Sequence, residues 1–237
     1  MPEIADYRGA ESENAGPLPV RTILSCNARG SSQLEIPAPR LSARLRARTD
    51  FLHEQTGVLL GLPDAIQTLE HYRGWLCQFL GLYESLEHSL ARFREWGNHG
   101  FALPSPSLSD CLAADLATLG IDPAGVARAP PALLPHLPTF AHALGALYVL
   151  EGSSLGGRVI LREVEVRIGP RITGATRFFG GRGTTPGQAW QAFKIALDAF
   201  GHEWPNLGGD VVSGAEGVFH AIIDWFAPLH MMTGKRT

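Results

Sequence analysis

The chain of 237 residues is poor in cysteine, in charge and in long apolar runs, and each of these deficiencies excludes a class of protein. Its three cysteines, Cys26, Cys77 and Cys111, form no CxxC pair and no zinc-binding spacing, so the sequence predicts neither a disulfide framework nor a zinc finger. Because no run of about 18 apolar residues exists, we expect no transmembrane helix. The first residues are acidic and lack the apolar core of a secretory signal. We therefore expect a reduced, cytoplasmic setting.

Positive charge is not in excess either. The net charge is −3 and the isoelectric point is near 6.3, so we expect neither nucleic acid nor a membrane as a partner. Hydrophobic residues make up 45% of the chain, which is enough apolar material for one large domain with a substantial core.

The order of segments predicts one helical domain. Residues 1–37 mix Gly, Pro, Ser and Asn without a period, so we expect a flexible N-terminal leader followed by a domain over residues 38–237. In that domain, apolar residues recur at three- and four-residue spacing and no segment alternates as a strand would, so the expected fold is all-α, a single-domain multi-helix bundle. The expected helices begin at residue 41 and then cover about 64–88, 89–96, 108–119, 138–168, 185–204 and 208–228, with a glycine-rich loop over 171–183.

Three helix starts have local signals. Ser107 or Ser109 is the expected N-cap of the helix over 108–119. Pro63 and Pro186 are expected in the first turns of the helices that follow them, because a proline there loses no intrahelical hydrogen bond.

The most informative segment is Leu144 to Ile160, LGALYVLEGSSLGGRVI, which is apolar but contains four glycines. Each glycine inside a helix costs roughly 1 kcal/mol relative to alanine, so a bend, a close neighbouring helix or a flat ligand is needed to account for them. A close helix crossing at Gly152 and Gly156 is one open alternative. The same segment spells GxSxG around Ser154, but a nucleophile elbow needs a preceding strand, so we interpret this match as chance.

His53 is the best candidate for a metal ligand among the nine histidines. In LRARTDFLHEQTG, Thr49 and Leu52 place it on the inward face of the first helix, and a neutral imidazole is a common axial ligand of haem iron. The acidic residues Glu151, Glu163 and Glu165 form no paired ExxH elements, which argues against a di-iron carboxylate bundle. A histidine and a glycine-bearing helix are what a flat iron macrocycle needs on its two faces.

Together these segments resemble the haem oxygenase family over roughly Leu41 to Trp225, with the closest likeness to the bacterial branch found alongside bacteriophytochromes. LRARTDFLH resembles the family's first helix and its iron-ligating histidine, and ALYVLEGSSLGGRVI resembles its distal helix. The segment AEGVFHAIIDWF is similar to the closing helix, with Phe219 and Trp225 at matching positions.

The resemblance implies that haem b is both cofactor and substrate and lies between the helix of His53 and the helix of Gly152–Gly157. The family opens the ring with O2 to give biliverdin, CO and ferrous iron. The resemblance further implies an external electron donor of the ferredoxin or flavodoxin type, and a bacteriophytochrome as acceptor of the bilin chromophore.

The resemblance also implies roles for single residues. His53 would be the iron ligand, and Gly152, Ser153, Gly156 and Gly157 would form the catalytic face over the ring. Thr49 would contribute to haem binding, and the anionic propionates would be held by basic residues, for which the candidates are Arg46, Lys194 and Arg177.

Two positions depart from the family pattern. Ser153 stands where many members have an aspartate, so a hydroxyl that can hold water replaces a carboxylate relay. Gly57 stands where several relatives carry a carboxylate one turn after the histidine, so His53 lacks that partner.

Two other functions remain open at this point. One is a non-catalytic haem-binding or haem-storage protein on the same fold. The other is a haem-free helical enzyme of the thiaminase-like superfold, against which the intact LRARTDFLH segment argues.

Overall fold

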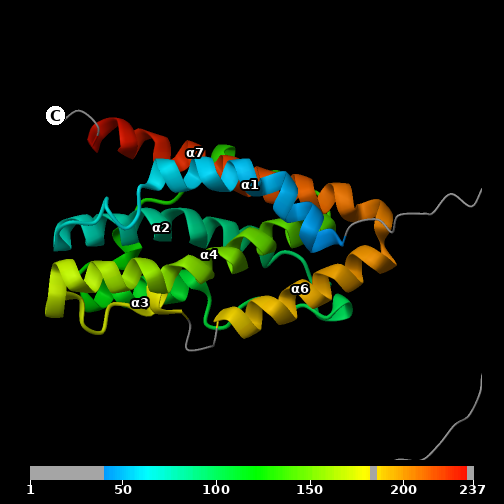
Figure 1. The fold of residues 1–237 in the computed structure, drawn as a ribbon. Coiled ribbons are helices and arrows are strands. Elements are labelled where there is room, and N and C mark those ends of the chain that lie inside the picture. The colour runs from blue at the N-terminus through cyan, green and yellow to red at the C-terminus, as the bar shows by residue number, and fades with distance from the viewer. Residues whose placement is uncertain (1–39, 182–185, 234–237) are drawn as a thin grey trace, which may run out of the picture. The chain divides into compact units, whose positions relative to one another are not determined.

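The computed structural model describes residues 40–181 and 186–233, and every regular element in these ranges is helical (Figure 1). This confirms the predicted all-α fold; the predicted leader over residues 1–37 lies outside the described residues. The α-helices are α1 (Leu41–Leu60), α2 (Leu69–Leu90), α3 (Leu108–Thr118), α4 (Phe140–Ile168), α5 (Arg177–Gly180), α6 (Pro186–Glu203) and α7 (Gly208–Thr233). Short 3-10 helices cover Trp96–His99, Pro123–Gly125, Pro131–Leu133, Gly169–Ile172 and Pro205–Leu207. None of the described helices is long and apolar enough to span a bilayer.

Several boundaries differ from the prediction for local reasons. The second helix begins at Leu69 instead of residue 64, because Thr68 caps it by accepting a hydrogen bond from the His71 N–H at 3.1 Å. Pro63 therefore precedes the helix by a full turn. No α-helix covers 89–96: α2 ends at Leu90, and the chain turns back so that the Trp96 indole donates to the Leu90 carbonyl.

Three further boundaries bear on the predictions. The expected loop over 171–183 contains the short helix α5, and α7 runs through Pro228 to Thr233, past the expected end at 228. Ser107 caps α3 as predicted, in a capping box with Asp110.

A close helix crossing that requires glycine does exist in α4, but it lies at Gly145 and not at Gly152 and Gly156. A Cβ on Gly145 would lie 1.8 Å from the Val211 carbonyl oxygen, and one on Gly214 of α7 would lie 1.9 Å from the His142 carbonyl oxygen. Any side chain at these positions would force α4 and α7 apart. The crossing accounts for Gly145 but not for the three glycines farther along α4.

Helices α1 and α4 run in the same direction, and α7 packs against both (Figure 1). In the middle of α1, Thr49 is in hydrogen-bond contact with the Tyr148 side chain of α4. Beyond the end of α1, Arg167 of α4 donates to the Pro63 carbonyl at 2.7 Å and to the Asp64 carboxylate at 2.6 Å. These two contacts tie the helices together and leave space between them.

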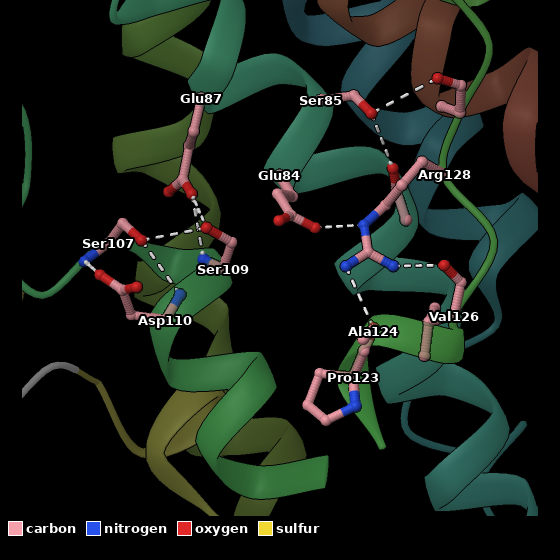
Figure 2. Close-up of polar contacts among 12 residues, drawn as sticks. Glu84, Ser85, Glu87, Ser107, Ser109, Asp110, Pro123, Ala124, Val126 and Arg128 are labelled. Atoms are coloured by element: carbon pink, nitrogen blue, oxygen red, sulfur yellow. Dashed lines mark hydrogen bonds and ion pairs between the residues drawn. The ribbon is translucent and has the colours of Figure 1, made fainter. Parts of the chain in front are cut away.

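Polar contacts of α2 fix the irregular segments that join the helices (Figure 2). Arg128 donates to Glu84 and to the carbonyls of Val126 and Pro123, which holds the proline-rich connection after α3. Glu87 accepts from the Leu108 N–H at 2.7 Å and from Ser109 at the start of α3. A carboxylate in that place is favoured by the unpaired N–H groups of a helix N-terminus.

Candidate functional site

A cavity of about 660 Å³ lies between α1 and α4 and brings together most of the residues that the sequence singled out. Helices α2, α5, α6 and α7 complete its walls. Its lining includes Arg46, Thr49, His53, Gly57, Tyr83, Tyr148, Gly152, Ser153, Ser154, Gly156, Gly157, Phe178, Phe179, Trp190, Lys194 and Phe219.

One wall is formed by α1. His53 lines the cavity and its side chain is open to it, with the ring of Phe219 edge-on at 6.2 Å between centroids. The neighbouring turns bury Thr49, which donates to the Leu45 carbonyl at 2.9 Å, and Thr56. The Thr56 hydroxyl is buried and has no hydrogen-bond partner among the described residues. The helical period of α1 predicted an inward face for His53, and in the structure this face of α1 lines the cavity.

The opposite wall is formed by α4, where the adjacent glycines have different surroundings. A Cβ on Gly156 would meet no atom within 4 Å, so this position leaves the cavity open at the helix backbone. A Cβ on Gly157 would lie 2.6 Å from the Phe179 carbonyl oxygen, so this position permits the close packing of α4 against α5. A Cβ on Gly152 would make ordinary contact, 3.5 Å from Trp190.

The serines of this wall are polar groups in an apolar setting. Ser154 lies in the middle of α4 and not at a strand end, as expected when the GxSxG match is coincidental, and its buried hydroxyl has no partner among the described residues. The Ser153 hydroxyl donates to the Leu150 carbonyl at 2.7 Å, and Ser153 is also in hydrogen-bond contact with Tyr83. Burial raises the pKa of Tyr83, and the Ser153 contact partly offsets this shift.

Tyr83 was not among the predicted site residues. Its spacing with Leu76, Phe79 and Leu80 on α2 correctly indicated a buried side chain, but that pattern does not distinguish a core tyrosine from one that reaches a cavity. The contact of Tyr83 with Ser153 depends on how α2 packs against α4, which the local sequence pattern does not reveal.

One end of the cavity is cationic. Arg46 of α1 and Lys194 of α6 both line it, and the Lys194 ammonium lies 5.9 Å from the centre of the Trp190 ring. Tyr148 stands between them, with its ring 5.2 Å from Trp190. Burial raises the pKa of Tyr148, and the Thr49 hydrogen bond and the Arg46 charge lower it in part. Two side chains far apart in sequence thus supply positive charge at the same place.

The other end of the cavity is apolar. This end is lined by Gly57 and Leu60 of α1 and by Leu62 and Ile160. Phe179 also lines it, with its backbone against Gly157. Gly57 stands where several family members carry a carboxylate. A Cβ on Gly57 would meet no atom within 4 Å, so the space that such a side chain would occupy is open. The lining therefore changes along α1, from the charged residues Arg46 and Asp50 to apolar groups near the end of the helix, and among the described residues its two cations are Arg46 and Lys194.

One of the predicted site residues, Arg177, lies elsewhere. Arg177 is not part of the cavity lining; its guanidinium donates to the Gly174 carbonyl at 2.6 Å and to the buried carboxylate of Asp115 at 3.3 Å. Trp225 also lies outside the lining, and its indole donates to the Gln78 carbonyl. Within the described ranges, no group of three or more His, Cys, Asp or Glu side chains is placed to hold a metal ion, so a metal here would have to bring most of its ligands with it.

Comparisons with known proteins bear on the family and the fold. The family model described as "Heme oxygenase" matches residues 39–228. Among solved structures, the NO- and CO-bound heme oxygenase from Neisseria meningitidis is similar with a TM-score of 0.60 and 21% sequence identity, over 80% of this chain and 94% of that chain. At that identity the likeness supports the fold alone. No curated protein matches the chain. Because the family model spans most of its length, the chain belongs to the haem oxygenase family.

Proposed function

We propose that the protein opens haem b to biliverdin with release of CO and ferrous iron. The observation that carries the proposal is that His53 and the glycine-bearing backbone of α4 line the same cavity, which has two cations at one end. Membership of the family supports a haem-degrading oxygenase activity in general.

The cavity suits the chemistry of haem. A porphyrin is flat and apolar with two anionic carboxylates at one edge, and the cavity is apolar at the end near Phe179 and cationic at the end near Arg46. The open backbone at Gly156 leaves room for a planar group, and the residues Thr56 and Ser154, whose buried hydroxyls have no partner among the described residues, also line the cavity. When bound and reduced, haem supplies both the iron that takes up O2 and the ring that is oxidised.

His53 would hold the iron from the α1 side. Imidazole is a common axial ligand of haem iron, and no carboxylate follows His53 at Gly57 to increase the basicity of the ring. Thr49 lies one turn earlier; its hydroxyl donates to the Leu45 carbonyl, and Thr49 is also in hydrogen-bond contact with Tyr148. This contact joins α1 to α4 beside His53.

Ser153 and Tyr83 would order water on the α4 side. Ser153 and Tyr83 are in hydrogen-bond contact, and the lone pairs of a hydroxyl oxygen allow it to accept a hydrogen bond from a water in the cavity. A pair of hydroxyls can pass protons along hydrogen bonds without becoming charged, which is the task that a carboxylate-anchored water performs in many family members. Gly152 contributes a surface without a side chain beside this pair.

Arg46 and Lys194 would orient the propionates. A carboxylate at this end would be near both cations, and no second cationic pair lines the apolar end within the described residues. Charged hydrogen bonds of this kind are worth about 1.5–3 kcal/mol each. They would favour one insertion of the ring, with its propionates at the start of α1.

The proposal extends to the partners. A soluble ferredoxin or flavodoxin-type donor would supply electrons in the cytoplasm, and a bacteriophytochrome would take up the bilin. The likeness of LRARTDFLH and ALYVLEGSSLGGRVI to the phytochrome-associated branch supports this part.

A second candidate is a haem-storage protein on the same fold, which the replacement of the common aspartate by Ser153 favours. The test is to load the protein with haem and supply O2 with a ferredoxin and its reductase. An oxygenase loses its Soret band and yields a bilin by chromatography together with CO. A Soret band that persists through many equivalents of reductant would establish storage.

A further inference from the structure

The carboxylate of Asp115 on α3 is buried, with 0% exposure, and lies outside the cavity lining. It accepts the backbone N–H groups of Arg177 at 3.0 Å and Phe178 at 2.9 Å, and the Arg177 guanidinium at 3.3 Å. Every one of these donors belongs to the start of α5. A buried carboxylate is costly unless it is paired and hydrogen-bonded, so this one is committed to holding α5.

Helix α5 is too short to hold its own position. It has four residues, fewer than a stable helical nucleus requires. Besides Asp115, the polar anchors of this segment among the described residues include the Tyr72 hydroxyl, which donates to the Ala175 carbonyl at 2.7 Å, and the Arg177 contact with Gly174. Arg158 of α4 donates to the Gly180 carbonyl at 3.3 Å and holds the end of α5. Asp115 is therefore the anchor at the start of the helix, where it accepts two backbone N–H groups.

The two phenylalanines of α5 form the Phe178–Phe179 wall of the cavity. Phe178 lies 5.7 Å from the ring of Tyr83, the partner of Ser153. The Phe179 backbone lies against Gly157 at the apolar end. A shift of α5 would therefore change both the apolar limit of the cavity and the packing around the hydroxyl pair.

We propose that Asp115 is a positioning residue for haem: by fixing the Phe178–Phe179 wall it sets how far and in which rotation the ring enters, and hence which meso carbon is oxidised. The inference rests on the proposed function. It also assigns Arg177 a role away from the propionates, as the cation that neutralises the buried carboxylate. The cations at Arg46 and Lys194 determine which edge of the ring points outward, and the wall determines how the opposite edge is seated.

The experiment compares Asp115→Asn with two other variants. Asn keeps the size of the side chain but turns one acceptor into a donor that faces backbone N–H groups. Arg177→Ala removes the guanidinium with its aliphatic stem, and so its contacts with Asp115 and Gly174, but keeps the backbone N–H that Asp115 accepts. It is the fallback if Asp115→Asn does not fold. Arg128→Gln is the matched control, because it breaks a polar anchor that joins the connection after α3 to Glu84 of α2 (Figure 2).

The first measurement is amide hydrogen exchange of the haem-free protein. We expect peptides covering residues 174–181 to exchange at least about tenfold faster in Asp115→Asn, since local opening governs such amides. The Arg128→Gln control should lower the melting temperature without this local effect.

The second reading is the pattern of haem methyl ¹H resonances in the ferric cyanide complex, which reports the rotation of the ring without turnover. We expect one dominant set in the wild type and in Arg128→Gln, and a second set in Asp115→Asn, matched by a second biliverdin isomer. Wild-type exchange and a single unchanged set of resonances in Asp115→Asn or Arg177→Ala would overturn the inference. A haem complex with altered seating but no bilin from any variant would support the inference and refute the proposed function.

Discussion

The carbonyl oxygen of Phe179 lies 2.6 Å from the place that a Cβ on Gly157 would take, whereas the same construction at Gly156 meets no atom within 4 Å. Two adjacent glycines in one helix thus have separate reasons to be glycine. Gly157 joins α4 to the aromatic wall of the cavity, and Gly156 keeps the helix surface bare inside it.

This difference makes the two glycines a matched pair for mutation. Gly157→Ala overpacks the contact with α5 and should lower the free energy of unfolding by about 1–3 kcal/mol. Gly156→Ala should leave stability unchanged or raise it by up to about 1 kcal/mol, because alanine favours a helix. Urea unfolding of the haem-free protein measures both. Equal destabilisation by the two variants would show that Gly156 also serves packing.

A larger residue at position 156 should act on the ligand instead of the fold. Gly156→Leu places a side chain in the cavity, so we expect circular dichroism of the haem-free protein to stay helical while haem binding weakens or ring opening stops. Ring opening at the wild-type rate in this variant would assign Gly156 to packing.

His53→Ala should remove the histidine-ligated spectrum of the haem complex and most of the turnover, with added imidazole restoring part of the ligation. His202→Ala is the control, because that side chain is exposed on α6 and does not line the cavity. Identical Soret bands in His53→Ala and wild type would exclude His53 as the ligand.

We expect Arg46→Ala and Lys194→Ala each to weaken haem binding by about 1.5–3 kcal/mol, because each variant removes one charged hydrogen bond. They should also broaden the set of biliverdin isomers, because the ring loses its fixed edge. Fluorescence-quenching titration and chromatography measure the two effects. Arg92→Ala, at an exposed position outside the cavity lining, should change neither.

The buried tyrosines predict the alkaline behaviour of the protein. Burial raises the pKa of Tyr72, Tyr83 and Tyr148 above the usual value of 10.0, so each phenol binds its proton more tightly in the folded state than in the unfolded chain. By linkage, their contribution to stability is complete below pH 10 and is lost as the pH rises above the pKa of the unfolded tyrosine. Absorbance at the tyrosinate band should rise later in the folded protein than in urea, and Tyr83→Phe should remove one late step.

The sequence was sufficient for the features that depend on local pattern. The 3.6-residue period predicted most helices and the inward face that carries Thr49 and Thr56, and Ser107 was recognisable as a cap. It misplaced the start of α2, because a capping threonine at position 68 is a weaker signal than a proline five residues earlier.

The features that depend on distant contacts were not accessible in this way. Arg177 is a basic residue in a glycine-rich segment, which suits an anion site, but its actual partner is Asp115, 62 positions earlier in the chain. Tyr83 fits a core pattern equally well with or without a serine opposite it. The sequence therefore predicted which helices face the cavity better than it predicted which polar groups meet there.

The cationic end of the cavity has a consequence for what happens after the ring is opened. Oxidation at a meso carbon leaves both carboxylates of the substrate intact, so Arg46 and Lys194 would hold the linear product as they held the macrocycle, while the tie to His53 is lost with the iron. Ion pairs at a solvent-open site weaken with salt, whereas an iron–imidazole bond does not. Escape of the bilin would then depend on ionic strength, or on an acceptor that competes for the same carboxylates, even where the oxidation itself does not.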